Sequence, residues 1–446
     1  MERDKMSIFK AYDIRGIYKE TIDEGIVYKI GRAYVLKFRP KKVTVGRDVR
    51  VSSPSLFKAL VKGITDQGCN VVDIGIVTTP MMYFSVWNYG HEGGLMISAS
   101  HNPPEYNGIK MVRKDAVPIG GETGIYEIGE MVSRLPDKLP GKKGKVEKLN
   151  VMDSYIAHSL SYLKKKLKKF RVVTDTANAV GGPTASKFFK KLGLELIHLF
   201  PELDGNFPNH EANPLKEENL NDLKEAVLKN KADIGIAFDG DADRCAFVDE
   251  KGNTVQSDMI IGLVAKAILA KEPGRKILYD VRCSRAVEDI IKISNGVPGR
   301  CMVGHSLVKA QMKREKAKFA GELSSHFYLE DEHYAEAPFF VIIKVLEMMT
   351  EENKKLSELV APLRKYFQSG EINSQVEDKE RKMREIAERF SDAEVTWLDG
   401  VTVEYGSWWF NVRPSNTEPY LRLNLEADTK KLMEKKREEI LSIIRS

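Results

Sequence analysis

Three successive stretches of this chain alternate short, strand-like apolar runs with longer amphipathic segments, and this alternation is the feature that most constrains the fold. Strands separated by helices predict α/β units built on mostly parallel sheets. The recurrence of the pattern indicates a threefold repeat. The strand-like runs cover residues 42–45, 71–74 and 95–97 in the first stretch, 171–173, 194–198 and 233–238 in the second, and 276–281 and 318–320 in the third. A helix is predicted over residues 184–191.

The pattern changes after residue 351. Residues 351–384 are charged and are predicted to form a helical, bridging segment. A final helix is predicted over residues 429–444, so the end of the chain should be an α+β domain. The closely spaced strands of that domain are expected near Val395, Val401, Trp408 and Leu421.

The length of 446 residues is too great for one compact core, because domains usually contain about 100–200 residues. We predict three similar α/β domains with mixed sheets and a C-terminal α+β domain. The predicted boundaries give domains over residues 1–149, 150–251, 252–363 and 364–446. Residues 136–148, which are rich in Lys, Gly and Pro, are predicted to be a linker.

The charge pattern argues against a nucleic-acid partner, because 70 basic and 64 acidic residues leave a formal net charge of only +6. The densest basic run, residues 164–169, has leucines at helical spacing and is predicted to be a solvated helix face. Four cysteines without a Cys-x-x-Cys pair fit a reducing cytoplasm. The charged N-terminus and the short apolar runs predict neither export nor membrane insertion.

The segment 97–110, Ile-Ser-Ala-Ser-His-Asn-Pro-Pro-Glu-Tyr-Asn-Gly-Ile-Lys, carries the strongest chemical signal. It places Ser100 among small residues, with His101 beside it and Lys110 ten positions later. An apolar run precedes it and two prolines block a helix, so it should be an exposed loop that leaves a buried strand. Ser100 is therefore a candidate nucleophile.

Residues 238–244, Phe-Asp-Gly-Asp-Ala-Asp-Arg, place three carboxylates at alternate positions of a short turn. Asp239, Asp241 and Asp243 suit Mg²⁺, which takes six oxygen ligands at about 2.1 Å. A calcium loop is the main rival, because these residues and Glu250 would fill its first, third, fifth and twelfth positions. Its sixth position needs glycine but holds Arg244, and strands are expected where that motif needs helices. The sequence therefore favours a magnesium site.

Other polar segments carry weaker signals. Residues 413–419, Arg-Pro-Ser-Asn-Thr-Glu-Pro, combine a guanidinium, hydroxyls and an amide that can bind phosphate. Glu322, Ser324 and His326 alternate, so in an extended loop they would point the same way toward a polyol. Residues 12–16 and 304–306 are as consistent with simple turns as with a site.

Taken together, these segments resemble the α-D-phosphohexomutase superfamily, in the expected order from Tyr12 to Arg422. The active-serine loop of that family is similar to residues 98–104 and its metal loop to residues 239–244. Its sugar loop is similar to residues 321–326 and its phosphate loop to residues 413–417.

The resemblance implies a four-domain, heart-shaped protein in which one loop from each domain faces a central cleft. It implies that Ser100 carries a phosphoryl group and that Mg²⁺ is held by the three aspartates and the Ser100 phosphate. That group would pass to a hexose 1-phosphate, and the resulting hexose 1,6-bisphosphate, also the activator, would turn over and return its other phosphate to Ser100. Proton transfer or charge stabilisation is implied for Arg15, Lys110 and His326, with His101 and Arg244 nearby. The residues implied to bind the phosphosugar are Tyr12, Arg282, His305, Glu322, Ser324, Arg413, Ser415, Asn416 and Thr417.

The sugar loop, with Gly-Glu-Leu-Ser at 321–324, and residues 280–285 are more similar to the phosphomannomutase/phosphoglucomutase branch than to phosphoglucosamine mutase. Ser325 stands where that family commonly has glycine, and Met302 where it often has lysine. Phosphoglucosamine mutase, a metal-dependent serine phosphohydrolase and a non-catalytic calcium- or sugar-phosphate-binding protein stay open as alternatives. The sequence does not fix the oligomeric state.

Overall fold

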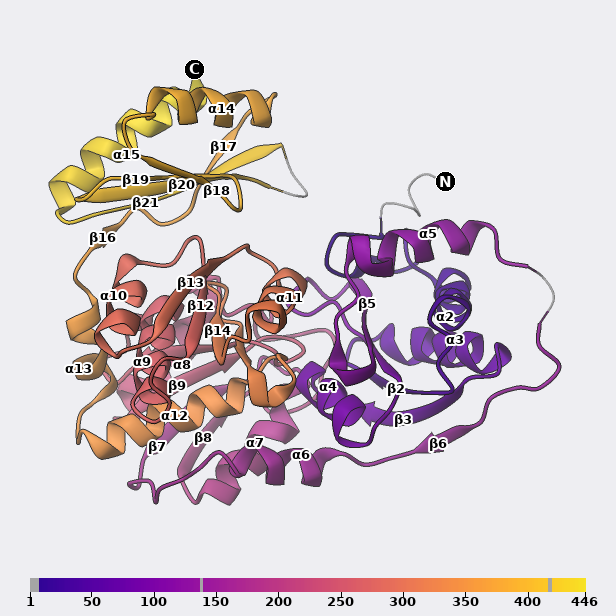
Figure 1. Cartoon of the computed structure of the whole chain (residues 1–446). Helices are drawn as coiled ribbons and strands as arrows, with labels where there is room; N and C mark the ends of the chain where they lie inside the picture. The colour runs from indigo at the N-terminus through magenta and orange to yellow at the C-terminus, as the bar shows by residue number, and fades with distance from the viewer. Residues whose placement is uncertain (1–7, 137–138, 416–418) are drawn as a thin grey trace. The chain divides into compact units, whose positions relative to one another are not determined.

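The computed structural model describes residues 8–136, 139–415 and 419–446 (Figure 1). These residues form two compact units. The first contains the described part of Met1–Val255 together with Ser324–Ser357, and the second contains Gln256–Leu323 with the described part of Glu358–Ser446. The four domain boundaries expected from the sequence stay a prediction.

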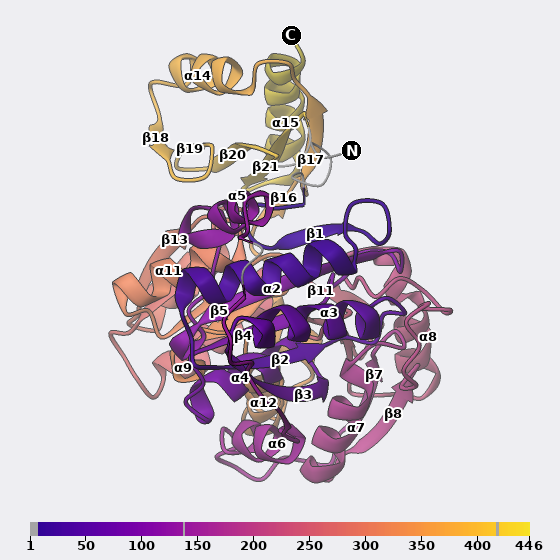
Figure 2. The ribbon, with the colours of Figure 1, turned by 90° about the vertical axis from the view of Figure 1, so that its right-hand side faces the viewer.

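The first unit begins with a mixed sheet of strand order β1-β5-β4-β2-β3-β6. Strands β4, β2, β3 and β6 run parallel, and β5 is antiparallel to both β4 and β1. Helices α2 and α3 lie side by side against this sheet (Figure 2). The strands are β1 (Ile14–Ile17), β2 (Lys42–Arg47), β3 (Asn70–Ile76), β4 (Gly93–Ile97), β5 (Tyr106–Arg113) and β6 (Val146–Lys148). The helices are α2 (Glu24–Phe38), α3 (Ser53–Asp66), α4 (Thr79–Asn88) and α5 (Tyr126–Ser133).

Local sequence explains where these helices begin and end. Asp23 caps α2 by accepting a hydrogen bond from the backbone N–H of Ile26, and the helix ends at Arg39 in the left-handed conformation. Thr78 caps α4 in the same way, through the backbone N–H of Met81. The apolar side chains of α2 and α3 form one buried core with those of strands β2, β3 and β4.

The first unit also holds a second mixed sheet, of strand order β11-β10-β9-β7-β8. Strands β8, β7 and β9 are parallel, whereas β10 is antiparallel to β9 and β11. The strands are β7 (Arg171–Asp175), β8 (Glu195–Leu199), β9 (Ile234–Phe238), β10 (Cys245–Asp249) and β11 (Thr254–Val255). Strand β15 (Phe327–Leu329), later in the chain, also lies in the first unit but is not part of this sheet. The helices are α6 (Met152–Leu160), α7 (Gly181–Leu192), α8 (Asn221–Lys229) and α12 (Pro338–Glu351).

The second unit contains a parallel arrangement in which β12 pairs with both β13 and β14. Its elements are α9 (Ser257–Leu269), β12 (Lys276–Asp280), α10 (Arg285–Ile293), β13 (Val297–Cys301), α11 (His305–Glu315) and β14 (Phe319–Gly321). The chain passes from the first unit to the second within α13 (Leu356–Val360). Short 3-10 or π turns lie at Lys114–Ala116, Gly121–Ile125, Glu217–Leu220, Glu330–Glu332 and Ala361–Leu363.

The end of the second unit is an antiparallel sheet of order β16-β21-β20-β19-β18, with β17 also paired to β21. Helices α14 and α15 cover one face of this sheet (Figure 1), and they share a buried core with it. The elements are β16 (Phe367–Gln368), β17 (Ile372–Gln375), α14 (Lys379–Arg389), β18 (Glu394–Trp397), β19 (Val401–Glu404), β20 (Trp408–Pro414), β21 (Tyr420–Ala427) and α15 (Lys430–Arg445).

These observations confirm the predicted fold class of α/β domains with mixed sheets followed by an α+β domain. Two local predictions are wrong. Residues 351–384 are not one helix, because α13, β16, β17 and the start of α14 divide them. Residues 164–169 are exposed but not helical: side chains of α12 bind the segment, with Glu347 and Thr350 accepting from the backbone N–H groups of Lys164 and Lys168.

Among the described residues, none of the helices combines the length and apolar character that a membrane crossing requires.

The C-terminal helix α15 shows why its sequence prediction succeeded. Thr429 accepts a hydrogen bond from the backbone N–H of Leu432 at 3.2 Å, and the apolar face of the helix is buried against the sheet.

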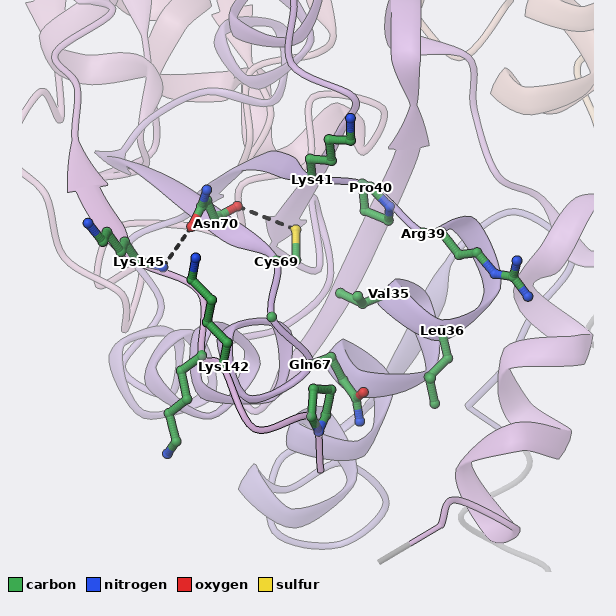
Figure 3. Close-up of a pocket in the computed structure, with 13 residues that line it drawn as sticks. Val35, Leu36, Arg39, Pro40, Lys41, Gln67, Cys69, Asn70, Lys142 and Lys145 are labelled. Atoms are coloured by element: carbon green, nitrogen blue, oxygen red, sulfur yellow. Dashed lines mark hydrogen bonds between the residues drawn. The ribbon is translucent and has the colours of Figure 1, made fainter. Parts of the chain in front are cut away.

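A basic cavity of about 720 Å³ opens where β2 and β3 begin (Figure 3). Its cationic lining comes from residues after α2 and before β6: Arg39, Lys41, Lys142, Lys143 and Lys145. Helices α2 and α3 both end here, and the partial negative charge of helix C-termini stabilises nearby cations. None of the site residues predicted from the sequence lines this cavity.

Candidate active site

The Ser100 loop, residues 98–105, joins the carboxyl end of β4 to β5. The hydroxyl of Ser98 accepts a hydrogen bond from the backbone N–H of Ser100 at 3.0 Å. Ser100 itself has φ of 50°, in the left-handed region that few non-glycine residues adopt. Its side chain is only 2% exposed, so the prediction of an exposed loop is wrong at this residue. The reason is that other loops of the first unit pack over it.

The acidic loop, residues 239–244, joins β9 to β10, and Phe238 pairs with Cys245 across the hairpin. Strands on both sides exclude the calcium-loop alternative, which needs flanking helices. The loop approaches the Ser100 loop so closely that a Cβ added at Gly240 would lie 2.2 Å from the carbonyl oxygen of Ser100. Glycine at this position is therefore what lets the two backbones meet.

The Ser100 hydroxyl lies among polar groups of both loops. Its Oγ donates a hydrogen bond to Oδ2 of Asp239 at 2.6 Å. Nδ1 of His101 lies 3.1 Å from Oγ of Ser100. The structure thus brings the predicted nucleophile into direct contact with the first of the three predicted metal ligands.

Lys110, on β5, extends into the acidic loop. Its ammonium donates to Oδ2 of Asp241 at 2.6 Å and to Oδ2 of Asp243 at 2.5 Å. Burial by itself would lower the pKa of Lys110, but the carboxylates of Asp241, Asp243 and Asp239 raise it above its ordinary value. Lys110 is therefore a fixed positive charge at neutral pH.

Burial and neighbouring charges also shift the pKa values of Asp239 and His101. Burial, followed by repulsion from Asp243 and Asp241, raises the pKa of Asp239 to about 7. Burial, followed by the positive charges of Arg244 and Arg15, holds the pKa of His101 well below its ordinary value. The His101 imidazole is therefore neutral at neutral pH.

The sugar loop predicted at 321–326 is divided between the two units. In the first unit, Nε2 of His326 lies 3.2 Å from both Nε of Arg244 and Oδ1 of Asp243. Nδ1 of His326 lies 3.1 Å from the hydroxyl of Ser324. Ser325 has φ of 65°, so the loop turns here and is not extended as predicted, although the side chains of Ser324 and His326 still lie together. This conformation also accounts for the glycine common at that position in the family that the sequence resembles.

Two residues near the start of the chain complete the predicted set in the first unit. Arg15, on β1, donates to the amide oxygen of Asn102 in the Ser100 loop at 2.5 Å and pairs with Asp13. Tyr12 is half-buried in the turn before β1.

In the second unit, basic residues gather around Glu371. Arg413 donates to the Glu371 carboxylate at 3.0 Å, Arg422 does so at 3.4 Å, and Arg282 lies 3.9 Å away. Nη2 of Arg422 also donates to the hydroxyl of Ser415 at 3.3 Å. Burial would raise the pKa of Glu371, but these guanidinium groups hold it below its ordinary value.

The other predicted residues of the second unit follow β12 and β14 or begin a helix. Arg282 donates to both carboxylate oxygens of Asp280, at 3.0 and 2.7 Å. His305 is the first residue of α11, and the preceding backbone N–H of Gly304 donates to Glu322 at 2.7 Å. Asn416 and Thr417 lie outside the described residues. The convergence of these residues and the Ser100 loop on one cleft stays a prediction.

The three aspartates fit an oxygen-bound divalent cation. Their carboxylate oxygens lie within 4.8 Å of one another, and all three side chains are buried. Oδ1 of Asp241 is buried without a hydrogen-bond partner among the described residues, whereas its Oδ2 accepts from Lys110. A buried carboxylate oxygen in that state is expected to bind a cation.

Two groups touch this site that sequence reasoning did not single out. The hydroxyl of Thr79, at the start of α4, donates to Oδ2 of Asp241 at 2.5 Å. Arg50, after β2, donates to backbone carbonyls of the Ser100 loop. Glu371 in the second unit was also missed, because the three arginines around it lie at positions 282, 413 and 422, far from it in sequence.

The arrangement in the first unit supports chemistry on an anionic group. It combines a hydroxyl, three carboxylates that can hold a cation, and the positive charges of Lys110, Arg244 and Arg15. Such a site can neutralise the charge of a phosphoryl group during its transfer and hold the phosphorus in line between the attacking and the leaving oxygen.

The chain matches the family models of phosphoglucomutase/phosphomannomutase alpha/beta/alpha domains I, II and III and of the C-terminal domain. The matches cover residues 6–135, 153–252, 256–366 and 371–443. The phosphomannomutase of Methanocaldococcus jannaschii is 40% identical over 445 residues, and that of Escherichia coli K12 is 39% identical over 434 residues. These alignments cover 98% and 95% of each chain, respectively.

The solved structures agree with the sequence relatives. The crystal structure of a phosphoglucomutase/phosphomannomutase family protein from Burkholderia thailandensis matches with a TM-score of 0.91 at 34% sequence identity. The match covers 98% of this chain and 97% of that one.

Proposed function

This chain belongs to the phosphoglucomutase/phosphomannomutase family, and from that premise we propose that it interconverts hexose 1-phosphate and hexose 6-phosphate through a phosphoserine at Ser100. It is an enzyme, an intramolecular phosphotransferase. We propose mannose and glucose phosphates as its substrates and hexose 1,6-bisphosphate as intermediate and activator. The phosphomannomutase names of relatives near 40% identity support mannose phosphate.

The observation that carries this proposal is the position of the Ser100 hydroxyl. It is buried, it donates to Asp239 at 2.6 Å, and it lies in the same unit as Lys110, Arg244 and Arg15. A serine in these surroundings can carry a phosphoryl group, because its oxygen is shielded from water and the charge of the group is balanced on several sides.

In the forward reaction, a hydroxyl of the sugar attacks the phosphorus atom of phosphorylated Ser100. A bond forms between the sugar oxygen and phosphorus, the bond from phosphorus to Oγ of Ser100 breaks, and the sugar hydroxyl loses its proton. After the bisphosphate reorients, Oγ of Ser100 takes the other phosphoryl group by the reverse step. The second half needs no external phosphate donor.

The charged and titratable residues of the site have separate roles in this proposal. Lys110 stabilises negative charge and does not take the proton, because its neighbouring carboxylates raise its pKa. His326 is the candidate for holding the proton, at a ring nitrogen, whereas burial and the charges of Arg244 and Arg15 lower the pKa of His101 and disfavour a proton there. Asp239, Asp241 and Asp243 would hold a Mg²⁺ ion, which supplies charge neutralisation for the phosphoryl oxygens when bound.

We further propose that the phosphate that is not reacting binds at Arg413 and Ser415, with Arg282, His305 and Glu322 contacting the sugar. The guanidinium groups around Glu371 support this assignment, since arginine binds phosphate through paired hydrogen bonds. A mutase needs such an anchor because each phosphate must be held while the other reacts.

The test uses the purified enzyme, mannose 1-phosphate and a trace of mannose 1,6-bisphosphate. We expect mannose 6-phosphate as the product, and intact-mass spectrometry should find one phosphoryl group that peptide mapping places on Ser100. Ser100→Ala should lose nearly all turnover and the adduct, while Ser98→Ala keeps the adduct. Turnover by Ser100→Ala would refute the carrier role. Stoichiometric release of free phosphate would instead indicate a serine phosphohydrolase.

A further inference from the structure

Arg50 holds the backbone of the Ser100 loop through one buried guanidinium group. The side chain is fully buried in the loop between β2 and α3. Nη2 donates to the carbonyl oxygens of Ser100 at 2.9 Å and Asn102 at 2.6 Å. Nη1 donates to the carbonyl oxygens of Pro103 at 2.5 Å and Tyr106 at 3.0 Å. Four carbonyl groups at the turn between β4 and β5 therefore share one cation.

The guanidinium is itself fixed from the other side. Its Nε donates to Oδ2 of Asp48 at 3.1 Å, and the backbone N–H of Arg50 donates to Oδ1 of the same carboxylate at 3.0 Å. The hydroxyl of Ser53 also donates to Asp48. The ring of Phe207 lies 5.1 Å from the guanidinium carbon, so the segment after β8 covers the remaining face.

The Ser100 loop depends on such a partner for physical reasons. Its carbonyl groups point toward Arg50 and not into a sheet, and a buried carbonyl without a donor costs about 1–3 kcal/mol. Ser100 also holds a left-handed φ of 50°. A planar guanidinium offers five N–H donors in a fixed geometry, whereas an ammonium offers three from a single point.

We propose that Arg50 is a positioning residue for phosphoryl transfer, which fixes the backbone of Ser100 so that Oγ stays in line with the acidic loop. This inference rests on the proposed carrier role of Ser100. Arg50 acts through the loop, because its donors are occupied by backbone carbonyls and Asp48. Its loss should therefore lower the rate of transfer without weakening the binding of the phosphosugar.

Arg50→Lys tests this proposal, with Arg32→Lys as the matched control. Arg32 is a buried arginine of α2 in the same unit, and it donates to the carbonyl of Pro136, away from the Ser100 loop. A misplacement of about 1 Å lowers catalysis by about 100-fold, and we expect kcat of Arg50→Lys to fall by that order. KM should stay within about twofold, since the predicted substrate contacts remain. Arg32→Lys should lose comparable thermal stability while keeping kcat.

Two further measurements separate positioning from stability. Hydrogen exchange over residues 98–106 should be faster in Arg50→Lys and unchanged in Arg32→Lys. The rate at which mannose 1,6-bisphosphate phosphorylates Ser100, followed by mass spectrometry, should fall together with kcat. In Arg50→Ala, added guanidinium ion should restore part of kcat if that variant folds.

The proposal is overturned if Arg50→Lys keeps kcat within about threefold of the unmodified enzyme, or if Arg32→Lys loses as much activity. It is also overturned if the loss in Arg50→Lys lies in KM alone. Failure of the proposed function looks different: the unmodified enzyme would then carry no phosphate on Ser100. Phosphorylated Ser100 with an unaffected Arg50→Lys would refute the positioning role only.

Discussion

Gly240 provides the sharpest test of how the Ser100 loop and the acidic loop fit together. A Cβ at this position would lie 2.2 Å from the carbonyl oxygen of Ser100, whereas real Cβ atoms essentially never come closer than 3.0 Å. Gly240→Ala must therefore move the loops apart by about 0.8 Å, the difference between those distances. The hydrogen bond from Ser100 to Asp239, now 2.6 Å, would lengthen by as much as that displacement, to at most about 3.4 Å, beyond the usual range.

This displacement sets the expected magnitudes. Overpacking of a close contact costs about 1–3 kcal/mol of stability, which a chain of this size should tolerate. The catalytic effect should be larger, because a misplacement of about 1 Å costs about 100-fold in rate. We therefore expect kcat for mannose 1-phosphate to fall by about 100-fold while the protein stays folded.

The assay compares Gly240→Ala with Gly141→Ala, a control at which an added Cβ meets no atom within 4 Å. Turnover of mannose 1-phosphate and thermal unfolding are measured for both. The control should match the unmodified enzyme in both measurements. If Gly240→Ala kept kcat within about threefold, the close approach of the two loops would not matter for catalysis and the reasoning would be refuted.

Three further predictions follow from other contacts of the site and the first unit. Thr79→Val removes the donor to Asp241 and should weaken Mg²⁺ affinity, measured by calorimetry, by about 10–100-fold. Thr79→Ser keeps the hydroxyl and should keep the affinity. Equal affinities of Thr79→Val and the unmodified enzyme would contradict the role of Thr79 in orienting Asp241. Arg413→Ala should raise KM for the phosphosugar through the loss of about 1.5–3 kcal/mol of binding, and an unchanged KM would exclude the anchor. Burial would raise the pKa of Asp66, but Lys143 and Lys62 lower it to about 2. The ionised carboxylate therefore stabilises the fold above the ordinary pKa of 3.8, and this stabilisation is lost as pH falls toward 2. In Asp66→Asn the free energy of unfolding should depend less on pH in that range.

The fold was predictable where local pattern and tertiary burial agree. The apolar runs at 42–45, 95–97 and 276–281 form β2, β4 and β12, because a strand buried in a parallel sheet is apolar on both faces. The prediction of a single helix over residues 351–384 is wrong, because charged residues with good helix propensity also occur in turns and short strands. Residues 164–169 failed because α12, far away in sequence, supplies side chains that bind their backbone.

The residues of the candidate site also fall into those that the local sequence identifies and those that it does not. Ser100 and the three aspartates were found because each loop carries its chemistry in consecutive residues. Thr79, Arg50 and Glu371 were missed because their partners lie in other segments and a single threonine, arginine or glutamate has no distinctive local pattern. The burial of Ser100 was missed for the same reason: a loop that leaves a strand looks exposed until the loop that covers it is known.

Charge balance favours a bound cation at the acidic loop. Asp239, Asp241 and Asp243 bring three negative charges into a buried volume, and Lys110 contributes one positive charge through its contacts with two of them. Nε of Arg244 lies 3.7 Å from Oδ2 of Asp239 and supplies a second positive charge. Burial, followed by the repulsion that remains from Asp243 and Asp241, raises the pKa of Asp239 to about 7. A cation bound by the three carboxylates would reduce that repulsion. A phosphoryl group on Ser100 would add a charge of about −1.5 to −2. A bound cation would help to balance this added charge, because Lys110 and Arg244 already face the carboxylates of the acidic loop.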